Sequence, residues 1–332
     1  MSLVKIAFLV FAVGIVGCSA GGGSSTPSGY INPDPPKPKP REDEANTVVY
    51  DPRVDILFVV DNSGSMSNHQ QQLANNIDQF LRTFFQNNVL EYQIGVITTD
   101  SPNLVGYPMF IDKSTPNPEV YLSRSLKVGT TGSPIEAVFD PTIGALTPPV
   151  SDQYNQGFFR DGAYLAVIFI TDAEDQSRQF RNPKVFYKTL VDLKHGDREK
   201  VLLYGVIVPT NTIYPTCARD GQETPVSIET ALQMSVTAPD NVMEICSPDY
   251  GVKLAALSQK LISQIAREVK LAQVPSVDSI EVIFGTQVIP EGDLEGWSYD
   301  STRNAVILGP NIKWVPQPKG TRLKVKYIPL NY

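Results

Sequence analysis

The chain has 332 residues, with 28 lysines and arginines against 35 aspartates and glutamates, and a formal net charge of −7 at pH 7. A chain of this length can hold one large domain and a smaller one. No cluster of lysine and arginine stands out, and nucleic-acid binding needs a basic face that offsets phosphate charge. The composition therefore argues against a nucleic acid as partner.

The first residues are typical of an export signal. After Lys5 comes an apolar run of about twelve residues, shorter than the roughly twenty that a membrane-spanning helix needs. The run ends in IVGC, residues 15–18, which resembles the lipobox of bacterial lipoproteins. This resemblance implies that residues 1–17 are a lipoprotein signal peptide and that Cys18 becomes the lipid-carrying N-terminus. The alternative is an ordinary signal peptide in which Cys18 has no such role.

Residues 18–47 are rich in glycine, serine and proline and are predicted to form a tether. Several acyl chains on Cys18 would anchor the protein stably in a membrane. Ser19, and not an aspartate, follows the cysteine. By the sorting pattern of Gram-negative lipoproteins, this favours the outer membrane of the cell envelope, with the periplasmic or surface side left open.

Four runs read as strands that are buried on both faces of a parallel sheet, because they are continuously apolar and rich in valine and isoleucine. Helical spacing of apolar residues lies between and after them, as in residues 73–84, 182–196 and 254–269. Strands that alternate with helices predict an open, doubly wound α/β domain with a mostly parallel sheet. The four runs are residues 54–60, 92–99, 165–171 and 201–209.

The pattern changes near the C-terminus. From about residue 277 the segments carry strand-type residues, and in LKVKY the lysines alternate with apolar side chains, as in a half-exposed strand. We therefore predict an α/β domain over residues 48–274 and a small β module over residues 275–332. A module of this size is marginal by itself, so we expect it to pack on the larger domain.

Three of the four predicted strands end on an aspartate: Asp61, Asp100 and Asp172. Ligands of open α/β sheets lie at the carboxyl ends of the strands, where these carboxylates would converge. Converging carboxylates repel one another unless a cation lies among them. Carboxylate and hydroxyl oxygens without histidine or thiolate suit a hard divalent cation.

The segment DNSGS, residues 61–65, follows the first predicted strand and resembles the DxSxS motif of von Willebrand factor type A (VWA) domains. FITDAEDQS, residues 169–177, is similar to the later TDG motif of that family, with alanine in place of glycine. The loop VGTTGSPIEAVF, residues 128–139, occupies the place of the family's threonine ligand. The resemblance covers about residues 50–272 and implies a Rossmann-like VWA fold.

The same resemblance implies a metal-ion-dependent adhesion site (MIDAS) with a divalent cation, Mg²⁺ as first choice and Mn²⁺ or Ca²⁺ as alternatives. Such a site keeps one coordination position open for an acidic side chain of a protein partner. For the loop ligand, Ser133 fits best, and Thr131 and Thr130 are the alternatives. The implied ligands are Asp61, Ser63, Ser65, Ser133 and Asp172.

Other functions are weighed against this binding protein. The aspartate and serines could merely cap the following helix, and the chain could be a structural or assembly subunit with a degenerate metal site. A hydrolase of the haloacid dehalogenase type would need a second acid where Ser63 stands. The sequence has neither GxxxxGK[ST] nor GxSxG, and two histidines offer little general-base capacity. We expect no enzymatic activity.

Some polar residues near the motifs are given lesser roles. Asp100 is either a residue behind the metal ligands or a turn residue with Ser101. Glu174 and Asp175 are predicted to form a solvated acidic rim. His69 is predicted to lie exposed on the first turn of its helix.

Besides Cys18, the chain has Cys217 and Cys246. An exported protein meets an oxidising compartment, so we predict that these two form a disulfide across a long irregular stretch. Zinc is disfavoured, because two cysteines lack the paired spacing and the chain has only His69 and His195.

Overall fold

The computed structural model describes residues 45–50, 52–85, 89–213, 224–315, 317–318 and 320–330. The predicted signal peptide, Cys18, nearly all of the predicted tether, and Cys217 lie outside the described residues. The predictions on lipidation and on the Cys217–Cys246 disulfide therefore stay predictions. Within the described part of the chain, no helix combines the length and the apolar character that crossing a bilayer requires.

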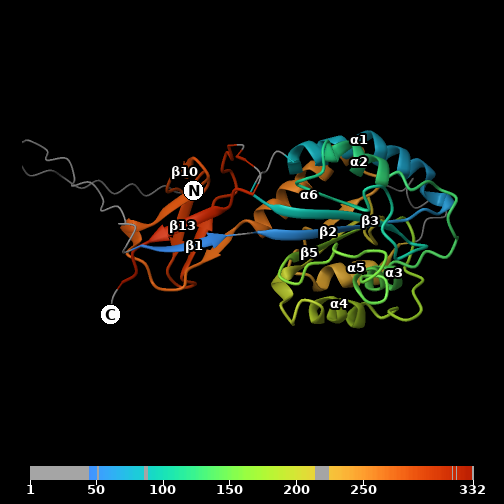
Figure 1. The fold of residues 1–332 in the computed structure, drawn as a ribbon. Helices are drawn as coiled ribbons and strands as arrows, with labels where there is room; N and C mark the ends of the chain where they lie inside the picture. The colour runs from blue at the N-terminus through green and yellow to red at the C-terminus, as the bar shows by residue number, and fades with distance from the viewer. Residues whose placement is uncertain are drawn as a thin grey trace, which may run out of the picture. The chain divides into compact units, whose positions relative to one another are not determined.

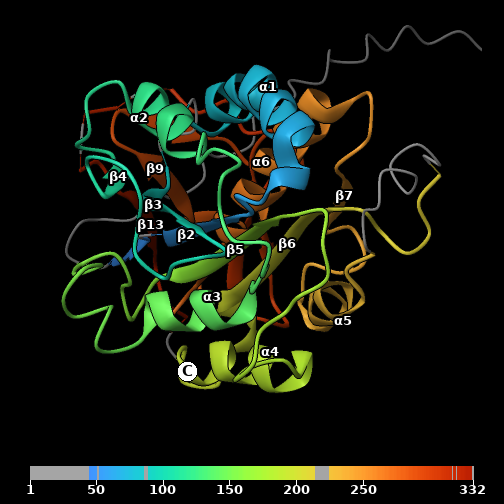
Figure 2. The same ribbon diagram turned by 90° about the vertical axis from the view of Figure 1, so that its right-hand side faces the viewer.

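The larger sheet has six strands in the order β4-β3-β2-β5-β6-β7. Neighbouring strands are parallel from β3 through β7, and only β4 runs antiparallel to its neighbour β3. The chain moves outward from β2 in both directions, as in doubly wound folds (Figure 2). The strands are β2 (Arg53–Val60), β3 (Glu91–Thr98), β4 (Phe110–Asp112), β5 (Tyr164–Ile170), β6 (Val201–Ile207) and β7 (Val242–Glu244).

The central strands are almost wholly buried, because helices cover both faces of the sheet. Figure 2 shows one helix layer on each side of the sheet. One layer has α1 (Ser67–Phe85), α2 (Pro118–Ser125) and α6 (Tyr250–Ile265), and the other has α3 (Phe139–Leu146), α4 (Pro183–Asp192) and α5 (Val226–Met234). Each layer encloses its own apolar cluster. The predicted α/β fold with a mostly parallel sheet flanked by helices is confirmed.

The four apolar runs become the four central strands of the large sheet, where their side chains are almost all buried. The four predicted strands are confirmed to within a residue or two, as β2, β3, β5 and β6. The helix predicted over residues 254–269 is shorter at its C-terminus, because α6 ends at Ile265 and Val269 lies in strand β8 (Glu268–Lys270). The apolar spacing continues across this junction because Val269 is also buried.

Two smaller antiparallel sheets account for the C-terminal strands. The first has the order β1-β13-β9-β10 and the second has the order β11-β12-β8. Strand β1 precedes the large sheet in the sequence but pairs along its whole length with β13 near the C-terminus (Figure 1). The strands are β1 (Asn46–Tyr50), β8 (Glu268–Lys270), β9 (Glu281–Phe284), β10 (Gln287–Ile289), β11 (Trp297–Asp300), β12 (Ala305–Leu308) and β13 (Leu323–Tyr327).

Candidate metal centre

The candidate site lies at the carboxyl edge of the large sheet, where the neighbouring parallel strands β2 and β5 end. The amide of Asp61 donates to the carbonyl of Ile170 at 2.9 Å, which continues the strand pairing by one step. Asp61 and Asp172 therefore leave adjacent strands at the same level. This is the convergence that the sequence predicts for the two aspartates.

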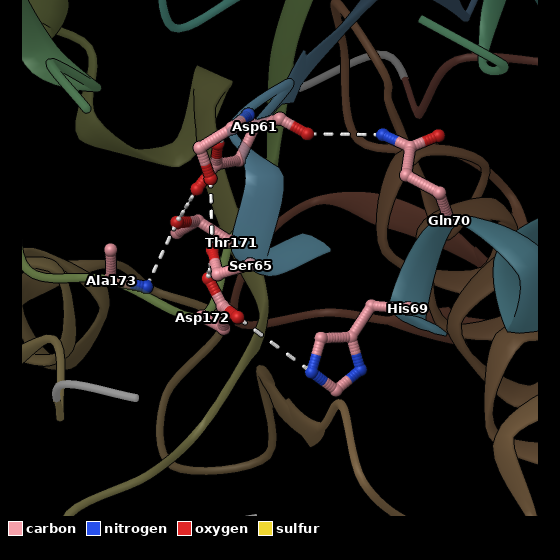
Figure 3. A network of polar contacts seen from close by, with 8 residues as sticks. Asp61, Ser65, His69, Gln70, Thr171, Asp172 and Ala173 are labelled. Carbon is pink, nitrogen blue, oxygen red and sulfur yellow. Dashed lines mark hydrogen bonds and ion pairs between the residues drawn. The ribbon is translucent and has the colours of Figure 1, made fainter. Parts of the chain in front are cut away.

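The carboxylate of Asp61 is fully buried and held by short hydrogen bonds (Figure 3). Its Oδ1 accepts from the Ser63 amide at 2.8 Å, and its Oδ2 accepts from the Thr171 hydroxyl at 2.7 Å. The side-chain amide of Gln70 donates to the Asp61 carbonyl at 3.0 Å. These contacts fix the carboxylate before any ligand arrives, and each oxygen keeps a further lone pair.

The two motif serines connect Asp61 to Asp172. The hydroxyl oxygens of Ser63 and Ser65 are 2.9 Å apart, and the Ser65 hydroxyl donates to Asp172 Oδ1 at 2.9 Å. Ser63 directly precedes the short 3-10 helix η1 (Gly64–Met66), and its side chain makes no capping hydrogen bond to it. These contacts give no support to the helix-cap alternative.

Asp172 has one carboxylate oxygen that accepts a hydrogen bond from a described residue and one that accepts none. Although Oδ1 accepts from Ser65, the buried Oδ2 accepts no hydrogen bond from any described residue. The His69 ring lies beside it, with Nε2 3.8 Å from Oδ2 (Figure 3). Burial raises the pKa of the Asp172 carboxyl, and the nearby Asp61 carboxylate raises it further, while Ser65 and His69 offset part of this rise.

Three of the lesser predictions are resolved by these contacts. His69 is only 5% exposed, so the prediction of an exposed first-turn histidine is wrong. It is buried because its side chain turns from α1 toward Asp172. Asp175 is half-buried and accepts the backbone amides of Val138 and Phe139, so it caps α3 and is not a solvated rim residue. Glu174, also half-buried, accepts the Ser227 amide near the start of α5.

The expected loop ligand, Ser133, is not joined to the other four. Its hydroxyl accepts from the Ile135 amide at 2.9 Å, and no hydrogen bond among the described residues connects its side chain to Asp61, Ser63, Ser65 or Asp172. The structure therefore brings four of the five predicted ligands into one hydrogen-bonded set. The role of Ser133, like that of Thr131 and Thr130, stays a prediction.

Two residues that orient the site were missed at the sequence level. Thr171 lies just before Asp172 and holds Asp61 Oδ2, while its oxygen also accepts from the Ala173 amide at 3.1 Å. Gln70 holds the Asp61 carbonyl from the first turns of α1. The TD pair at the end of an apolar strand was a visible signal for Thr171. No local signal marks Gln70, because its contact depends on where α1 begins.

The donor set fits a hard divalent cation. It consists of two carboxylates and two hydroxyls, and such oxygens suit Mg²⁺, Mn²⁺ or Ca²⁺ better than soft metals. The buried Asp172 Oδ2 adds an acceptor that receives no hydrogen bond from a described residue and has the His69 ring beside it at 3.8 Å. Among the described residues, no three or more His, Cys, Asp or Glu side chains are grouped so that they could hold a metal ion, and this site combines its two carboxylates with hydroxyls.

A scan of protein-family models finds none that matches this chain, and a search of curated proteins finds no relative. Solved structures do match. Proximal thread matrix protein 1 from the mussel byssus is 14% identical with a TM-score of 0.37, over 65% of this chain and 48% of that one. A von Willebrand factor type A structure from Catenulispora acidiphila is 11% identical with a TM-score of 0.41, over 86% and 61%.

The conserved hypothetical protein BatB from Bacteroides thetaiotaomicron is 12% identical with a TM-score of 0.36, over 64% of this chain and 98% of that one. For the mussel and Catenulispora proteins, the match spans less than two thirds of their length. Because all three TM-scores are below 0.5, the fold is assigned from the strand order and the helix layers described above. That fold is an α/β domain with a mostly parallel six-stranded sheet, accompanied by small antiparallel sheets.

Proposed function

We propose that this chain is a VWA-type binding protein of the cell envelope that holds a divalent cation at the carboxyl edge of its large sheet. Asp61, Ser63, Ser65 and Asp172 would bind the cation, with Ser133 completing the set from its loop. The observation that carries the proposal is the buried Asp172 Oδ2, which accepts no hydrogen bond from a described residue and lies in the same hydrogen-bonded set as Asp61. The cation would add positive charge at this oxygen, beside which the His69 ring lies at 3.8 Å.

Electrostatics supports this assignment. Two carboxylates lie close together in a buried place, and an uncompensated pair of this kind is unfavourable. The hydroxyls of Ser63 and Ser65 are neutral ligands, so the bound cation would keep much of its charge. Such a cation attracts a further anionic ligand. We therefore propose that a protein partner binds by offering an acidic side chain to the open coordination position.

Calorimetric titration with Mg²⁺ and Mn²⁺ tests the metal site. We expect binding by the wild type, no measurable binding by Asp61→Ala or Asp172→Ala, and wild-type binding by Asp112→Ala. Asp112 is the matched control, because it is an aspartate that also accepts hydrogen bonds from a surface turn. It lies at the end of β4, opposite Gln93 near the amino end of β3, and so away from the carboxyl edge of the sheet. Equal binding by Asp61→Ala would exclude this site.

The partner and the location need separate tests. Capture of a partner from envelope extracts should require the metal, and chelation or Ser133→Ala should weaken it. Cys18→Ser should release the protein from the membrane fraction and prevent labelling with a radioactive fatty acid. A Cys18→Ser protein that is still lipidated and membrane-bound would contradict the lipid-anchor proposal while leaving the metal site untouched.

One observation favours a second candidate, a structural or assembly subunit with a degenerate site. The Ser133 hydroxyl accepts from the Ile135 amide and makes no hydrogen bond to the other four residues, as expected of a loop that has lost its ligand role. In that case the wild type would not bind Mg²⁺ or Mn²⁺. Any partner would then bind equally well in chelator.

A further inference from the structure

Asp100 occupies a defined place next to the candidate metal site. It follows β3 by two residues, and β3 is the parallel neighbour of β2, so Asp100 lies at the same sheet edge as Asp61. Both carboxylate oxygens of Asp100 accept from the Ser133 amide, each at 3.1 Å. Asp100 is therefore attached to the backbone of the loop that carries the expected fifth ligand.

Asn62 completes this attachment from inside the DNSGS motif. Its side-chain amide donates to Asp100 Oδ2 at 2.9 Å, and its side-chain oxygen accepts from the Thr99 hydroxyl at 3.2 Å. Its backbone carbonyl accepts from the Gly132 amide at 2.8 Å. Asn62 stands between the ligands Asp61 and Ser63, so the contacts connect the loop directly to the ligand-bearing segment.

The loop of residues 128–139 packs closely against the DNSGS motif. A Cβ atom added to Gly132 would lie 2.4–2.5 Å from the side-chain amide atoms of Asn62, which is too short for any real contact. Only glycine therefore allows the backbone at this position to approach Asn62 as it does. Farther along the same loop, Asp175 accepts the amides of Val138 and Phe139, so the loop is held at two separated points.

We propose that Asp100 is a positioning residue of the metal site, which holds the loop at Ser133 against Asn62 so that a loop oxygen reaches the cation. This inference rests on the proposed metal-binding function and adds a residue to it. Asp100 would act through the Ser133 backbone and through Asn62 and would not bind the cation itself. Residues behind the metal ligands commonly change metal affinity about 10–100-fold when they are replaced.

Calorimetric titration of the full chain with Mn²⁺ tests the role of Asp100. We expect Asp100→Ala to raise the Mn²⁺ dissociation constant by about 10–100-fold. Asp100→Asn keeps one oxygen for the Ser133 amide, so its Mn²⁺ dissociation constant should rise by less than about tenfold. Asp112→Ala is the matched control and should bind like the wild type. Thermal unfolding without metal should show Asp100→Ala no less stable than Asp112→Ala.

A second variant approaches the same contact from the loop. Gly132→Ala should weaken Mn²⁺ binding as Asp100→Ala does, because its new methyl group pushes the loop away from Asn62. This variant decides the matter if Asp100→Ala does not fold. If Asp100 acted only through its charge, Asp100→Asn would bind Mn²⁺ as weakly as Asp100→Ala, and Gly132→Ala would bind it like the wild type. This result would overturn the positioning role.

The inference and the proposed function fail in different ways. If Asp61→Ala loses Mn²⁺ while Asp100→Ala and Gly132→Ala bind like the wild type, the metal site stands and the positioning role of Asp100 is wrong. If the wild type binds no Mn²⁺, or if Asp61→Ala binds it as well as the wild type, the proposed site is wrong and the role of Asp100 falls with it.

Discussion

Two buried aspartates lie near the two ends of strand β2, at opposite edges of the large sheet, and their surroundings differ. Asp55, near the amino end, and Asp61, just past the carboxyl end, are both fully buried. The Asp55 carboxylate forms a two-point contact with Arg160, through the guanidinium Nε at 2.7 Å and the backbone amide at 2.7 Å. Asp61 instead accepts from one backbone amide and one hydroxyl.

The sheet edge at the amino ends of the parallel strands, here called the amino edge, also has a second cation. Lys194 is only 1% exposed, donates to the Arg160 carbonyl at 2.8 Å and lies 3.9 Å from the centre of the Phe159 ring. Burial raises the pKa of the Asp55 carboxyl, and the contacts with Arg160 work against that rise. At Asp172 the neighbouring Asp61 adds to the rise.

This difference indicates a different role for each edge of the sheet. At the amino edge the chain supplies its own cations, so the ion pair there serves the fold. At the carboxyl edge two carboxylates face hydroxyls and, among the described residues, the His69 ring is the basic group beside Asp172. This is where we propose an external cation. The four predictions below test the contrast, from the largest expected effect to the smallest.

Arg160→Ala should be the most damaging change. It leaves Asp55 buried and removes the donors that Arg160 gives to the carbonyls of Val54 and Glu91. Breaking a buried pair from one side costs about 3–5 kcal/mol, which urea unfolding would measure. Lys188→Ala, which removes the exposed pair with Asp192, should change stability by less than about 0.5 kcal/mol. Similar losses in both variants would mean that the Arg160 pair has no special role.

Metal should stabilise the carboxyl edge selectively. At a Mn²⁺ concentration one hundred times the dissociation constant, the free energy of unfolding of the wild type should rise by about 2.7 kcal/mol. Asp61→Ala should show no rise, whereas Arg160→Ala should rise as the wild type does, because its site is intact. Urea unfolding with Mn²⁺ and with chelator measures both. A rise in Asp61→Ala would place the metal elsewhere.

Lys194 should give the amino edge an alkaline pH dependence. Burial lowers the pKa of Lys194 to about 8, although Asp55 and Asp161 oppose this change. Between that pH and the ordinary lysine value of 10.5, the unfolded chain binds more protons than the folded one, so stability rises with pH.

The expected rise for Lys194 is about 1–2 kcal/mol, because one group contributes at most about 1.4 kcal/mol per pH unit. Urea unfolding at pH 7.5, 9 and 10 should show this rise in the wild type and not in Lys194→Met. Equal slopes in the two proteins would assign the pH dependence to other groups.

Asp172→Asn should have the smallest effect on the stability of the metal-free protein, and this effect should be a gain where Arg160→Ala gives a loss. The raised pKa of Asp172 means that the wild type loses stability as pH rises from about 3.8 through the raised value. Asparagine avoids this loss and keeps an oxygen for the Ser65 hydroxyl. We expect a gain of about 0.5 kcal/mol at pH 7 in chelator.

The gain from Asp172→Asn should shrink toward acid pH, where the wild-type carboxyl is itself protonated. Denaturant unfolding at pH 7 and pH 4 measures this difference, and Mn²⁺ binding should be weakened in the same variant. A loss of stability at pH 7 would show that the ionised Asp172 is already compensated in the metal-free protein.

Much of the fold was readable from the sequence because it depends on near neighbours. The runs rich in valine and isoleucine predicted β2, β3, β5 and β6, since strands covered on both faces are largely apolar on both sides and do not alternate. The spacing of Leu73, Ile77, Phe80 and Phe84 predicted the buried face of α1. The order of strands and helices alone then places Asp61 and Asp172 at one sheet edge.

Contacts between residues far apart in the chain were decided only by the tertiary structure. Nothing near Arg160 in the sequence shows that it pairs with Asp55, and nothing near Asn46–Tyr50 shows that this strand pairs with β13. His69 was misjudged because helical spacing does not reveal that its side chain turns toward Asp172. The physical reason is that periodicity reports which face of an element is buried, whereas partners across a sheet edge are set by how loops bring distant segments together.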